Sequence, residues 1–273
     1  MRRQIIRVHP YLLLASRDRH IAAEGIVAEP LTGKVAVVTG GSRGIGRAIS
    51  TALAADGASV IVNYAANADA ADQTVRAIRG AGRRAESFQA DIADPTSAAR
   101  LFSAAEQALG PVDILVCNAG VAAVMPLTEV SAADYERIFG VNVRSLVFLL
   151  QVAARSLADQ GRIITLSSTI AAYPRSGMAL YAASKAAVSA LTEVAAIELG
   201  PRGITANCVL PGMIETDMIA RLPPDHRKAV AESSPFNRIG TPDDITGIVR
   251  FLASEESRWI TGQSILANGG ARR

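Results

Sequence analysis

A glycine-rich turn near the start of the chain constrains the possible fold more than any other feature. A valine-rich run at 35–38 leads into residues 39–46, Thr-Gly-Gly-Ser-Arg-Gly-Ile-Gly, and a helical pattern follows. A strand, a glycine turn and a helix in this order let backbone N–H groups surround a phosphate. Gly40 permits the tight turn, Gly44 the close approach of a pyrophosphate, and Gly46 the packing of the helix on the strand. Taken alone, the spacing Gly-x-x-x-Gly-x-Gly also fits an ordinary turn between a strand and a helix.

Strand-like and helix-like segments alternate along the rest of the chain, separated by short stretches of Gly, Pro or Asp. Apolar residues make up 49% of the sequence and aromatic residues only 4%, so aliphatic side chains must fill the core, as in a parallel sheet covered on both faces. We therefore expect one α/β domain, a doubly wound seven-stranded parallel sheet with right-handed crossovers. Strands are predicted near 34–39, 59–63, 84–89, 112–117, 161–167, 203–209 and 263–267, and helices near 44–56, 68–81, 95–109, 131–159, 180–200 and 241–253.

Two segments depart from this alternation. Residues 1–33 precede the domain, which we place at 34–273, and their five Arg residues and short apolar runs predict a flexible arm or an overlong start rather than a targeting peptide. Residues 212–240 carry three of the twelve Pro around a short helical stretch. This second segment is either a lid over a pocket or a plain surface excursion.

Composition and charge exclude several classes of protein. The net charge of +3 comes from scattered Arg, so nucleic acid is not an expected partner, and no run approaches the eighteen or so apolar residues that span a membrane. Cys117 and Cys208 fall in apolar runs; on strands separated by one other strand they would lie about 10 Å apart, beyond disulfide reach. This suits a reducing, cytoplasmic compartment. With only His9, His20 and His226, the chain has little material for a Ser-His-Asp hydrolase or a zinc site, and no metal is predicted.

The pair Tyr181 and Lys185, in the run Tyr-Ala-Ala-Ser-Lys, is the most informative chemical feature. Spaced i, i+4 on a helix, the phenol and the ammonium share one face. An unperturbed Tyr has a pKa of about 10, and a neighbouring cation lowers it. We expect Lys185, together with a positively charged cofactor ring, to bring the pKa of Tyr181 toward neutrality, which takes about 4 kcal/mol. The competing interpretation is an amphipathic helix with an exposed Lys.

Polar residues gather where the predicted strands end, which is where open parallel sheets bind ligands. Asp91 follows the third strand, 118–120 (Asn-Ala-Gly) the fourth, Ser168 the fifth and 211–212 (Pro-Gly) the sixth. Asn142 lies between two Val inside a predicted helix, where an amide needs a partner. Each residue has an ordinary structural alternative as a turn or cap residue, but their joint placement along one edge predicts a site.

With these motifs, residues 34–270 resemble the short-chain dehydrogenase/reductase family. The resemblance rests on the glycine turn at 39–46, Asn118-Ala-Gly, Ser168, Tyr181-x-x-x-Lys185, Pro211-Gly212, and the closing motifs at 260–263 (Ile-Thr-Gly-Gln) and 268–270 (Asn-Gly-Gly). It implies a Rossmann-type fold and an oxidoreductase that transfers a hydride with a nicotinamide cofactor. Cys117 departs from the family, which often has a second Asn at this place.

The resemblance implies roles for four residues. Tyr181 would be the general acid that protonates a carbonyl oxygen in reduction, or the base in oxidation, and Ser168 would hydrogen-bond the same oxygen. Lys185 would lower the pKa of the Tyr and hold the nicotinamide ribose. Asn142 would fix a water that links Lys185 to solvent in a proton relay.

NADPH is the expected cofactor, in preference to NAD. An NAD site usually has an acidic residue about 20 positions past the glycine loop, whereas the second strand here ends in Asn63 and Tyr64. Arg43 in the loop would pair with a 2′-phosphate; its alternative is a solvated loop residue. The residues expected to line the cofactor are Gly40, Ser42, Arg43, Gly44, Ile45, Gly46, Asn63, Tyr64, Asp91, Ile92, Asn118, Ala119, Gly120, Tyr181, Lys185, Pro211, Gly212, Ile214 and Thr216.

The substrate is less constrained. Segments 211–218 and 233–240 resemble those of 3-oxoacyl-[acyl-carrier-protein] reductases, which implies a small-molecule or acyl-thioester carbonyl substrate. An acidic carrier protein needs a basic approach to the pocket; Arg202 would contribute, but 158–160 (Ala-Asp-Gln) is not basic. A broad-specificity aldehyde, ketone, quinone or sugar reductase is the alternative within the family.

Two further hypotheses stand outside this class. A non-catalytic NADP-binding scaffold or sensor would not need the complete set of four catalytic residues, and a hydrolase built on Ser168 would need a His that the central region does not have.

The resemblance also implies a homotetramer. Its subunits would pair through the helices at 131–159 and from 180 onward, with the stretch around Trp259 in a second interface. The alternative for the apolar helix faces is the core of a single subunit.

Overall fold

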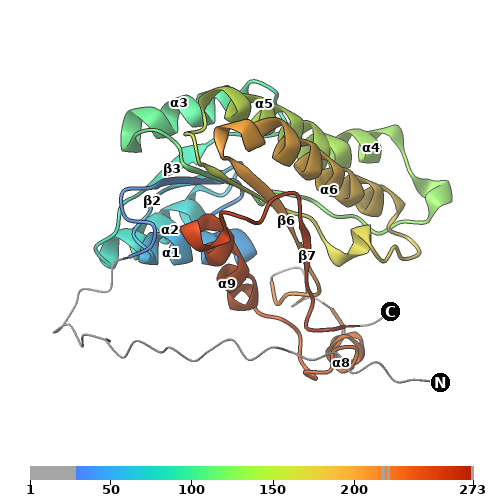
Figure 1. Cartoon of the computed structure of the whole chain (residues 1–273). Coiled ribbons are helices and arrows are strands. Elements are labelled where there is room, and N and C mark those ends of the chain that lie inside the picture. Colours follow the sequence, from blue (N-terminus) through green and yellow to red (C-terminus); the bar gives the residue numbers. More distant parts are fainter. Residues whose placement is uncertain (1–28, 217–218, 220–221, 272–273) are drawn as a thin grey trace, which may run out of the picture.

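A computed structural model describes residues 29–216, 219 and 222–271; the rest of the predicted arm, 1–28, lies outside this part of the chain. Seven parallel strands form one sheet in the order β3-β2-β1-β4-β5-β6-β7 (Figure 1). The strands are β1 (Val35–Val38), β2 (Ser59–Tyr64), β3 (Ala85–Gln89), β4 (Ile114–Cys117), β5 (Arg162–Leu166), β6 (Thr205–Pro211) and β7 (Ser264–Ala267). The order reverses between β1 and β4, so a crevice is expected at the carboxyl ends of these two strands. The predicted fold is confirmed.

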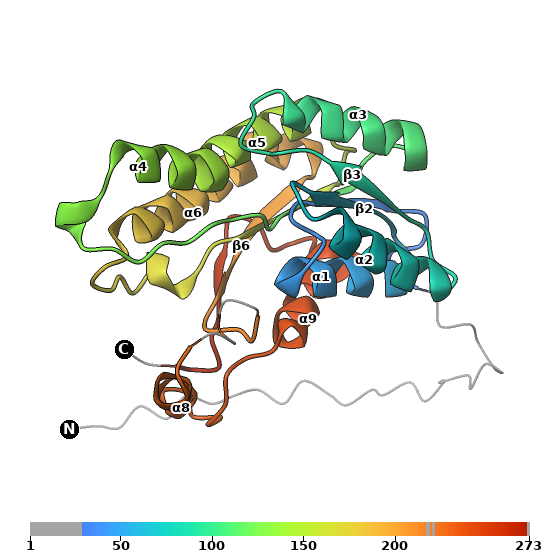
Figure 2. The same cartoon turned by 180° about the vertical axis from the view of Figure 1, so that it is seen from behind.

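Helices cover both faces of the sheet (Figures 1 and 2). One layer contains α1 (Gly44–Ala55), α2 (Ala68–Gly80) and α9 (Pro242–Ala253), and the other contains α3 (Ser97–Leu109), α4 (Ala132–Phe139), α5 (Ser145–Ser156) and α6 (Ala179–Leu199). Alternate residues of β1 enter the two cores: Val35 and Val37 pack in the cluster with α3, α5 and α6, and Ala36 and Val38 in the cluster with α1 and α9. Burial on both faces explains why this strand is an uninterrupted apolar run.

The predicted helix at 131–159 is not continuous. A π-helical turn, η2 (Gly140–Arg144), separates α4 from α5. The side chain of Asn142 leaves this turn to bond the backbone of Val121, on the connection after β4. Single π-helical turns inside α-helices are often found at functional sites.

The two cysteines lie as predicted. Cys117 on β4 and Cys208 on β6 are both in register with Thr165 of the intervening strand β5, so about 10 Å separates them. Both thiols are buried and free.

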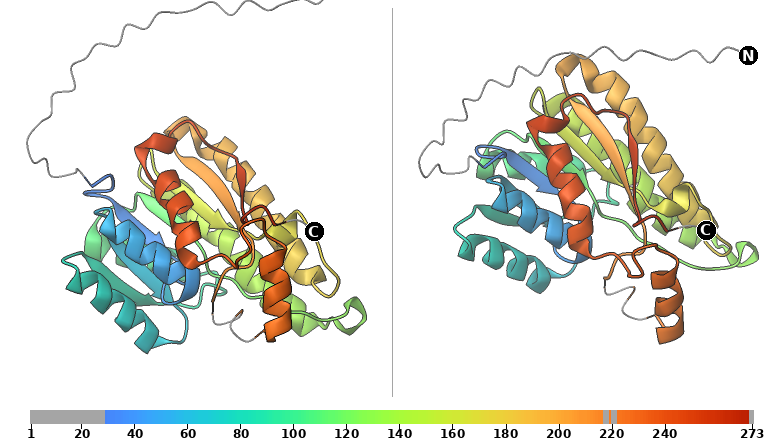
Figure 3. Two further views of the ribbon diagram at one scale, coloured as in Figure 1. Left: turned by 90° about the horizontal axis from the view of Figure 1, so that it is seen from below. Right: turned by 60° about the horizontal axis from the view of Figure 1, so that its bottom comes forward.

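The two segments outside the regular alternation are partly described. Ahead of the predicted start at Lys34, Leu31 is buried and its N–H donates to the carbonyl oxygen of Asp56. In the segment 212–240, α8 (Pro224–Glu232) buries none of its residues and stands apart from both helix layers (Figures 1 and 3). Ile214 and Gly240 form a parallel bridge at the base of this segment.

Two helical stretches, Ala132–Ser156 and Ala179–Arg202, are long and apolar enough to cross a membrane by length and composition alone. In this fold they are α4–η2–α5 and the α6 region. Leu146, Leu149, Val188 and Leu199 of these stretches are buried in the core of the domain. Packing within the domain therefore accounts for the buried part of these stretches, whereas Val147, Val194 and Ile197 on them are exposed.

Candidate active site

The glycine loop between β1 and α1 forms one wall of the site. Gly40 and Gly44 have φ angles of +61° and +53°, which a residue with a side chain rarely adopts. A Cβ at Gly46 would lie 2.2 Å from the carbonyl oxygen of Gly40, so only glycine fits there. Helix α1 begins with no side-chain cap and no acidic residue in its first turn. Its first N–H groups are therefore available to an anion such as a pyrophosphate.

Two asparagines hold this loop in place. Asn118 Nδ2 donates to the carbonyl oxygens of Thr39 (3.0 Å) and Gly40 (3.1 Å). Asn63 is buried at the end of β2; its Oδ1 accepts from the Gly40 N–H (3.3 Å), and its Nδ2 donates to the carbonyl oxygen of Ala90 (3.0 Å). Asn63 was predicted to line the cofactor. Its side-chain amide is hydrogen-bonded to Gly40 of the glycine loop and to the backbone of Ala90.

The remaining predicted cofactor residues surround this loop. Arg43 is exposed, and none of the described residues pairs with its guanidinium, which leaves it available to a 2′-phosphate. The methyl group of Thr216 would lie 3.4 Å from a Cβ at Gly44, so the chain after β6 passes over the loop. Of the others, Ser42, Ile92, Pro211 and Ile214 are buried, Ile45, Tyr64, Asn118, Ala119 and Gly212 are half-buried, and Asp91 and Gly120 are exposed.

Tyr181, Ser168 and Lys185 come together as the spacing predicts. Tyr181, in the first turn of α6, is close enough to Ser168 for a side-chain hydrogen bond that lowers the pKa of the phenol. Ser168 is the N-cap of η3 (Thr169–Ala171), two residues after the end of β5. Lys185 is buried, with Nζ 5.8 Å from the centre of the Tyr181 ring. Nζ donates to the carbonyl oxygen of Leu166 at 2.8 Å.

The expected effect of Lys185 on Tyr181 does not appear in the chain by itself. Burial raises the pKa of Tyr181 above its usual value, and the hydrogen bond with Ser168 only partly opposes this. Burial also lowers the pKa of Lys185 to about 8. Desolvation is the largest cause of both shifts, and the ammonium of Lys185 donates to a backbone carbonyl oxygen.

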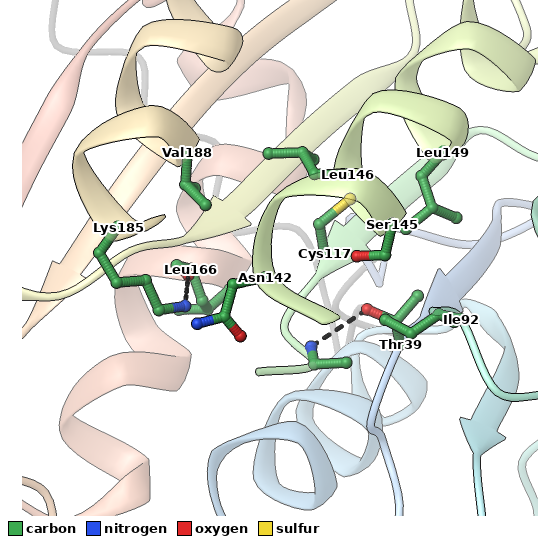
Figure 4. A pocket seen from close by; sticks show the side chains of 11 residues that line it. Thr39, Ile92, Cys117, Asn142, Ser145, Leu146, Leu149, Leu166, Lys185 and Val188 are labelled. Atoms are coloured by element: carbon green, nitrogen blue, oxygen red, sulfur yellow. Dashed lines mark hydrogen bonds between the residues drawn. The ribbon is translucent and has the colours of Figure 1, made fainter. Parts of the chain in front are cut away.

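Asn142 lies beside Lys185 around a small cavity of about 10 Å³ (Figure 4). This volume is about the room that one water occupies. Gly120 separates the two side chains: a Cβ there would lie 3.2 Å from Lys185 Nζ and 3.3 Å from Asn142 Oδ1. Cys117 also lines the cavity, where burial raises the pKa of its thiol to about 12. The cavity therefore offers a place for the water of the predicted proton relay.

The sequence reasoning missed two serines. Ser184 is fully buried between Asn142 and the first turn of α6, and the hydroxyl of Ser167 donates to the carbonyl oxygen of Lys185 at 2.7 Å. Both are neighbours of residues that the motifs had identified, and this adjacency was the available signal. Among the described residues, no group of three His, Cys, Asp or Glu is placed to hold a metal ion.

Known proteins resemble this chain over most of its length. A family model described as enoyl-(acyl carrier protein) reductase matches residues 40–272. A short-chain type dehydrogenase/reductase of Picea abies is 41% identical over 251 residues, covering 88% of this chain and 93% of that protein. A hydroxynaphthalene reductase-like protein of Metarhizium majus is 40% identical over 257 residues, covering 88% of this chain and 96% of that protein.

A solved structure is also similar. The short-chain dehydrogenase of Burkholderia cenocepacia, crystallised in complex with NADP, is 43% identical, with a TM-score of 0.84. The match covers 89% of this chain and 99% of that one.

Proposed function

The chain belongs to the short-chain dehydrogenase/reductase family, and we propose that it is an NADPH-dependent reductase that converts a carbonyl group to an alcohol. One observation carries this proposal. A half-buried Tyr181, next to Ser168 and one helical turn from the buried Lys185, lies at the carboxyl edge of the sheet that also bears the uncapped glycine loop. This is the arrangement that a proton donor for a substrate oxygen needs.

Different residues of the chain have different roles in the proposed reduction. NADPH, when bound, supplies the hydride. Tyr181 holds the proton that the carbonyl oxygen receives, and its raised pKa keeps it protonated at neutral pH, as a general acid must be. Ser168 can donate a hydrogen bond to the same oxygen as negative charge develops there. Lys185 is placed to stabilise Tyr181 after the proton leaves, and the cavity beside Asn142 can hold the water that returns a proton.

NADP(H) is the cofactor that the site fits. The first turn of α1 offers N–H groups without a competing carboxylate, and the exposed Arg43 beside it suits a 2′-phosphate. The similar structure from Burkholderia cenocepacia carries NADP. Neither Asn63 nor Tyr64 at the end of β2 could act as the carboxylate that an NAD ribose usually meets.

We propose a carbonyl substrate that is not presented on an acidic carrier protein. Arg202, in the 3₁₀ turn η4 (Gly200–Arg202), donates to Asp159 Oδ1 (2.7 Å), to the carbonyl oxygen of Ala154 (2.9 Å) and to that of Leu157. Its charge is therefore already neutralised, and the basic approach that a carrier requires is weak. A free 3-oxoacyl thioester and a simple ketone or aldehyde both fit this proposal.

Reduction of a 3-oxoacyl group on its carrier, the first expectation from the sequence, becomes the second candidate. The segments 211–218 and 233–240 favour it, and the matching family model takes its description from an acyl-carrier-protein reductase. The relative from Metarhizium majus, named for hydroxynaphthalene, favours a ring ketone instead. We further propose a cytoplasmic homotetramer, for which the exposed apolar residues considered in the Discussion give support.

An assay of NADPH oxidation tests the proposed reaction. Acetoacetyl thioesters with and without the carrier, quinones, simple aldehydes, ring ketones and sugars serve as substrates. Tyr181→Phe should lower kcat at least 100-fold while NADPH still binds, because the variant loses only the proton donor. The matched control is Tyr135→Phe, which removes a hydroxyl from an exposed Tyr stacked on Phe139 of α4 and should leave turnover unchanged.

Three results would contradict this function. Turnover that survives in Tyr181→Phe would exclude Tyr181 as the acid. NADPH binding by the wild type without oxidation by any carbonyl would favour the scaffold or sensor. Ester hydrolysis without cofactor, lost in Ser168→Ala, would favour the hydrolase.

A further inference from the structure

We propose that Ser184 is a positioning residue that fixes Asn142 against Lys185; the inference rests on the proposed carbonyl reductase function. Ser184 has no exposed surface. Its hydroxyl donates to the carbonyl oxygen of Tyr181 (2.8 Å) and accepts from Asn142 Nδ2 (2.9 Å). One hydroxyl thus connects the first two turns of α6, which carry Tyr181 and Lys185, to the π-helical turn that carries Asn142.

The hydrogen bonds leave the Asn142 amide one orientation. A serine hydroxyl has a single proton, and Ser184 gives it to the Tyr181 carbonyl, so toward Asn142 it can act only as an acceptor. The second proton of Asn142 Nδ2 goes to the carbonyl oxygen of Val121 (2.9 Å), and Oδ1 accepts from the Val121 N–H (2.8 Å). Both protons of the buried amide are therefore used, and without Ser184 one of them has no acceptor among these contacts.

Asn142 needs such support because of where it lies. It occupies the π-helical turn η2 and is buried, so each polar atom of its side-chain amide needs a hydrogen-bond partner. Val121 holds the amide from the connection after β4, and Ser184 is its anchor to the catalytic helix.

The position of this amide matters for the proton relay. Asn142 Oδ1 and Lys185 Nζ both lie close to the position that a Cβ at Gly120 would take. The two residues also line the same water-sized cavity (Figure 4). A small rotation of the amide would change the distance between these two polar atoms and the hydrogen bonds open to a water between them. Ser184 acts on the reaction through this geometry, without touching the substrate or the cofactor.

Ser184→Ala tests the proposal, since alanine suits a helix and removes only the hydroxyl, which accepts from Asn142 Nδ2 and donates to the Tyr181 carbonyl. We expect kcat for carbonyl reduction to fall about tenfold, which corresponds to the cost of one buried unpaired donor. The KM for NADPH should stay within twofold of wild type. Hydrogen exchange of the Val121 amide, which bonds Asn142 Oδ1, should become faster. Ser184→Cys, with a weaker acceptor of similar shape, should give an intermediate kcat and replaces Ser184→Ala if that variant does not fold.

Two comparisons separate positioning from loss of stability. If Ser184 acts only through Asn142, Ser184→Ala should cost no further kcat in an Asn142→Ala background. The matched control is Thr192→Val, further along α6, where a buried hydroxyl bonds Thr165 Oγ1 at 2.8 Å, away from the catalytic turn. This variant should lose stability but keep wild-type kcat.

Three outcomes would overturn the inference. Ser184→Ala could turn over at the wild-type rate, or it could lower kcat as much in the Asn142→Ala background as in the wild type. Thr192→Val could also lose as much kcat as Ser184→Ala. If the wild type reduces no carbonyl, the proposed function fails by itself. The exchange of the Val121 amide then still decides the positioning: faster exchange in Ser184→Ala supports it, and unchanged exchange overturns it.

Discussion

Lys185 illustrates at the scale of one residue how a catalytic site costs stability. Its ammonium is buried, with one carbonyl oxygen, that of Leu166, as its acceptor. Burial lowers its pKa from 10.5 to about 8. Between these two pH values the unfolded chain binds a proton that the folded chain does not, so stability rises with pH in that window. Below about pH 8 the full cost of the buried charge is present.

Lys185→Met should therefore be more stable than wild type at pH 7, by up to about 3 kcal/mol, less the loss of the bond to Leu166. This advantage should shrink as the pH rises from 8 to 10.5, and reductase activity should be lost at every pH. Urea unfolding across this range measures the difference. Lys228→Met, at an exposed position on α8, is the control and should show no such pH dependence. A Lys185→Met variant less stable than wild type at pH 7 would contradict the argument.

At the scale of the element, local patterns determined what the sequence could predict. Every predicted strand overlaps an observed one, because apolar runs and Gly or Pro punctuation are local signals. The π-helical turn η2 was missed because Asn142 is held by Val121 and Ser184, which lie far from it in sequence. The supporting role of Asn63 was missed for the same reason: the absence of a carboxylate at the end of β2 can be read from the sequence, but burial beneath the glycine loop cannot.

The glycine turn gives a prediction at this scale. A Cβ at Gly46 would lie 2.2 Å from the Gly40 carbonyl oxygen and 2.5 Å from Asn118 Nδ2. The Asn118 amide donates two hydrogen bonds to the loop backbone, so moving either group away would cost hydrogen bonds or backbone strain. Gly46→Ala should lower the free energy of unfolding by about 1–3 kcal/mol and weaken NADPH binding more than tenfold.

Gly80→Ala is the matched control for this prediction. Gly80 ends α2, and no atom lies within 4 Å of the Cβ that alanine would add. This variant should be more stable than wild type by about 0.5–1 kcal/mol, with unchanged NADPH affinity. Thermal unfolding and titration of NADPH fluorescence measure both effects. Equal behaviour of the two variants would mean that close packing at Gly46 does not shape the loop.

For the whole molecule, exposed apolar side chains support the proposed tetramer. On the described surface they include two groups, defined by the elements that carry them: Val147, Val194 and Ile197 on α5 and α6, and Phe251, Trp259 and Leu266 on α9, β7 and the chain between them. Trp259 is 95% exposed, which is unusual for so large an apolar side chain. Two self-complementary patches, each around its own two-fold axis, generate a tetramer with dihedral symmetry.

A mutation in one patch should therefore disrupt that interface and leave the other interface intact. Trp259→Glu should convert a tetramer of 28.5-kDa chains into a dimer held by α5 and α6, and Ile197→Glu should leave the other dimer, because a buried unpaired carboxylate costs more than an interface of this kind gains. The double variant should be a monomer. Sedimentation velocity distinguishes these states. The control Val124→Glu, at a residue as exposed as Ile197 (75% against 77%) but in neither patch, should remain a tetramer. A wild-type monomer would refute the assembly, and a tetramer that survives Trp259→Glu would remove the second patch from it. Since the catalytic residues all come from one chain, the dimers should keep their NADPH site even where their stability falls.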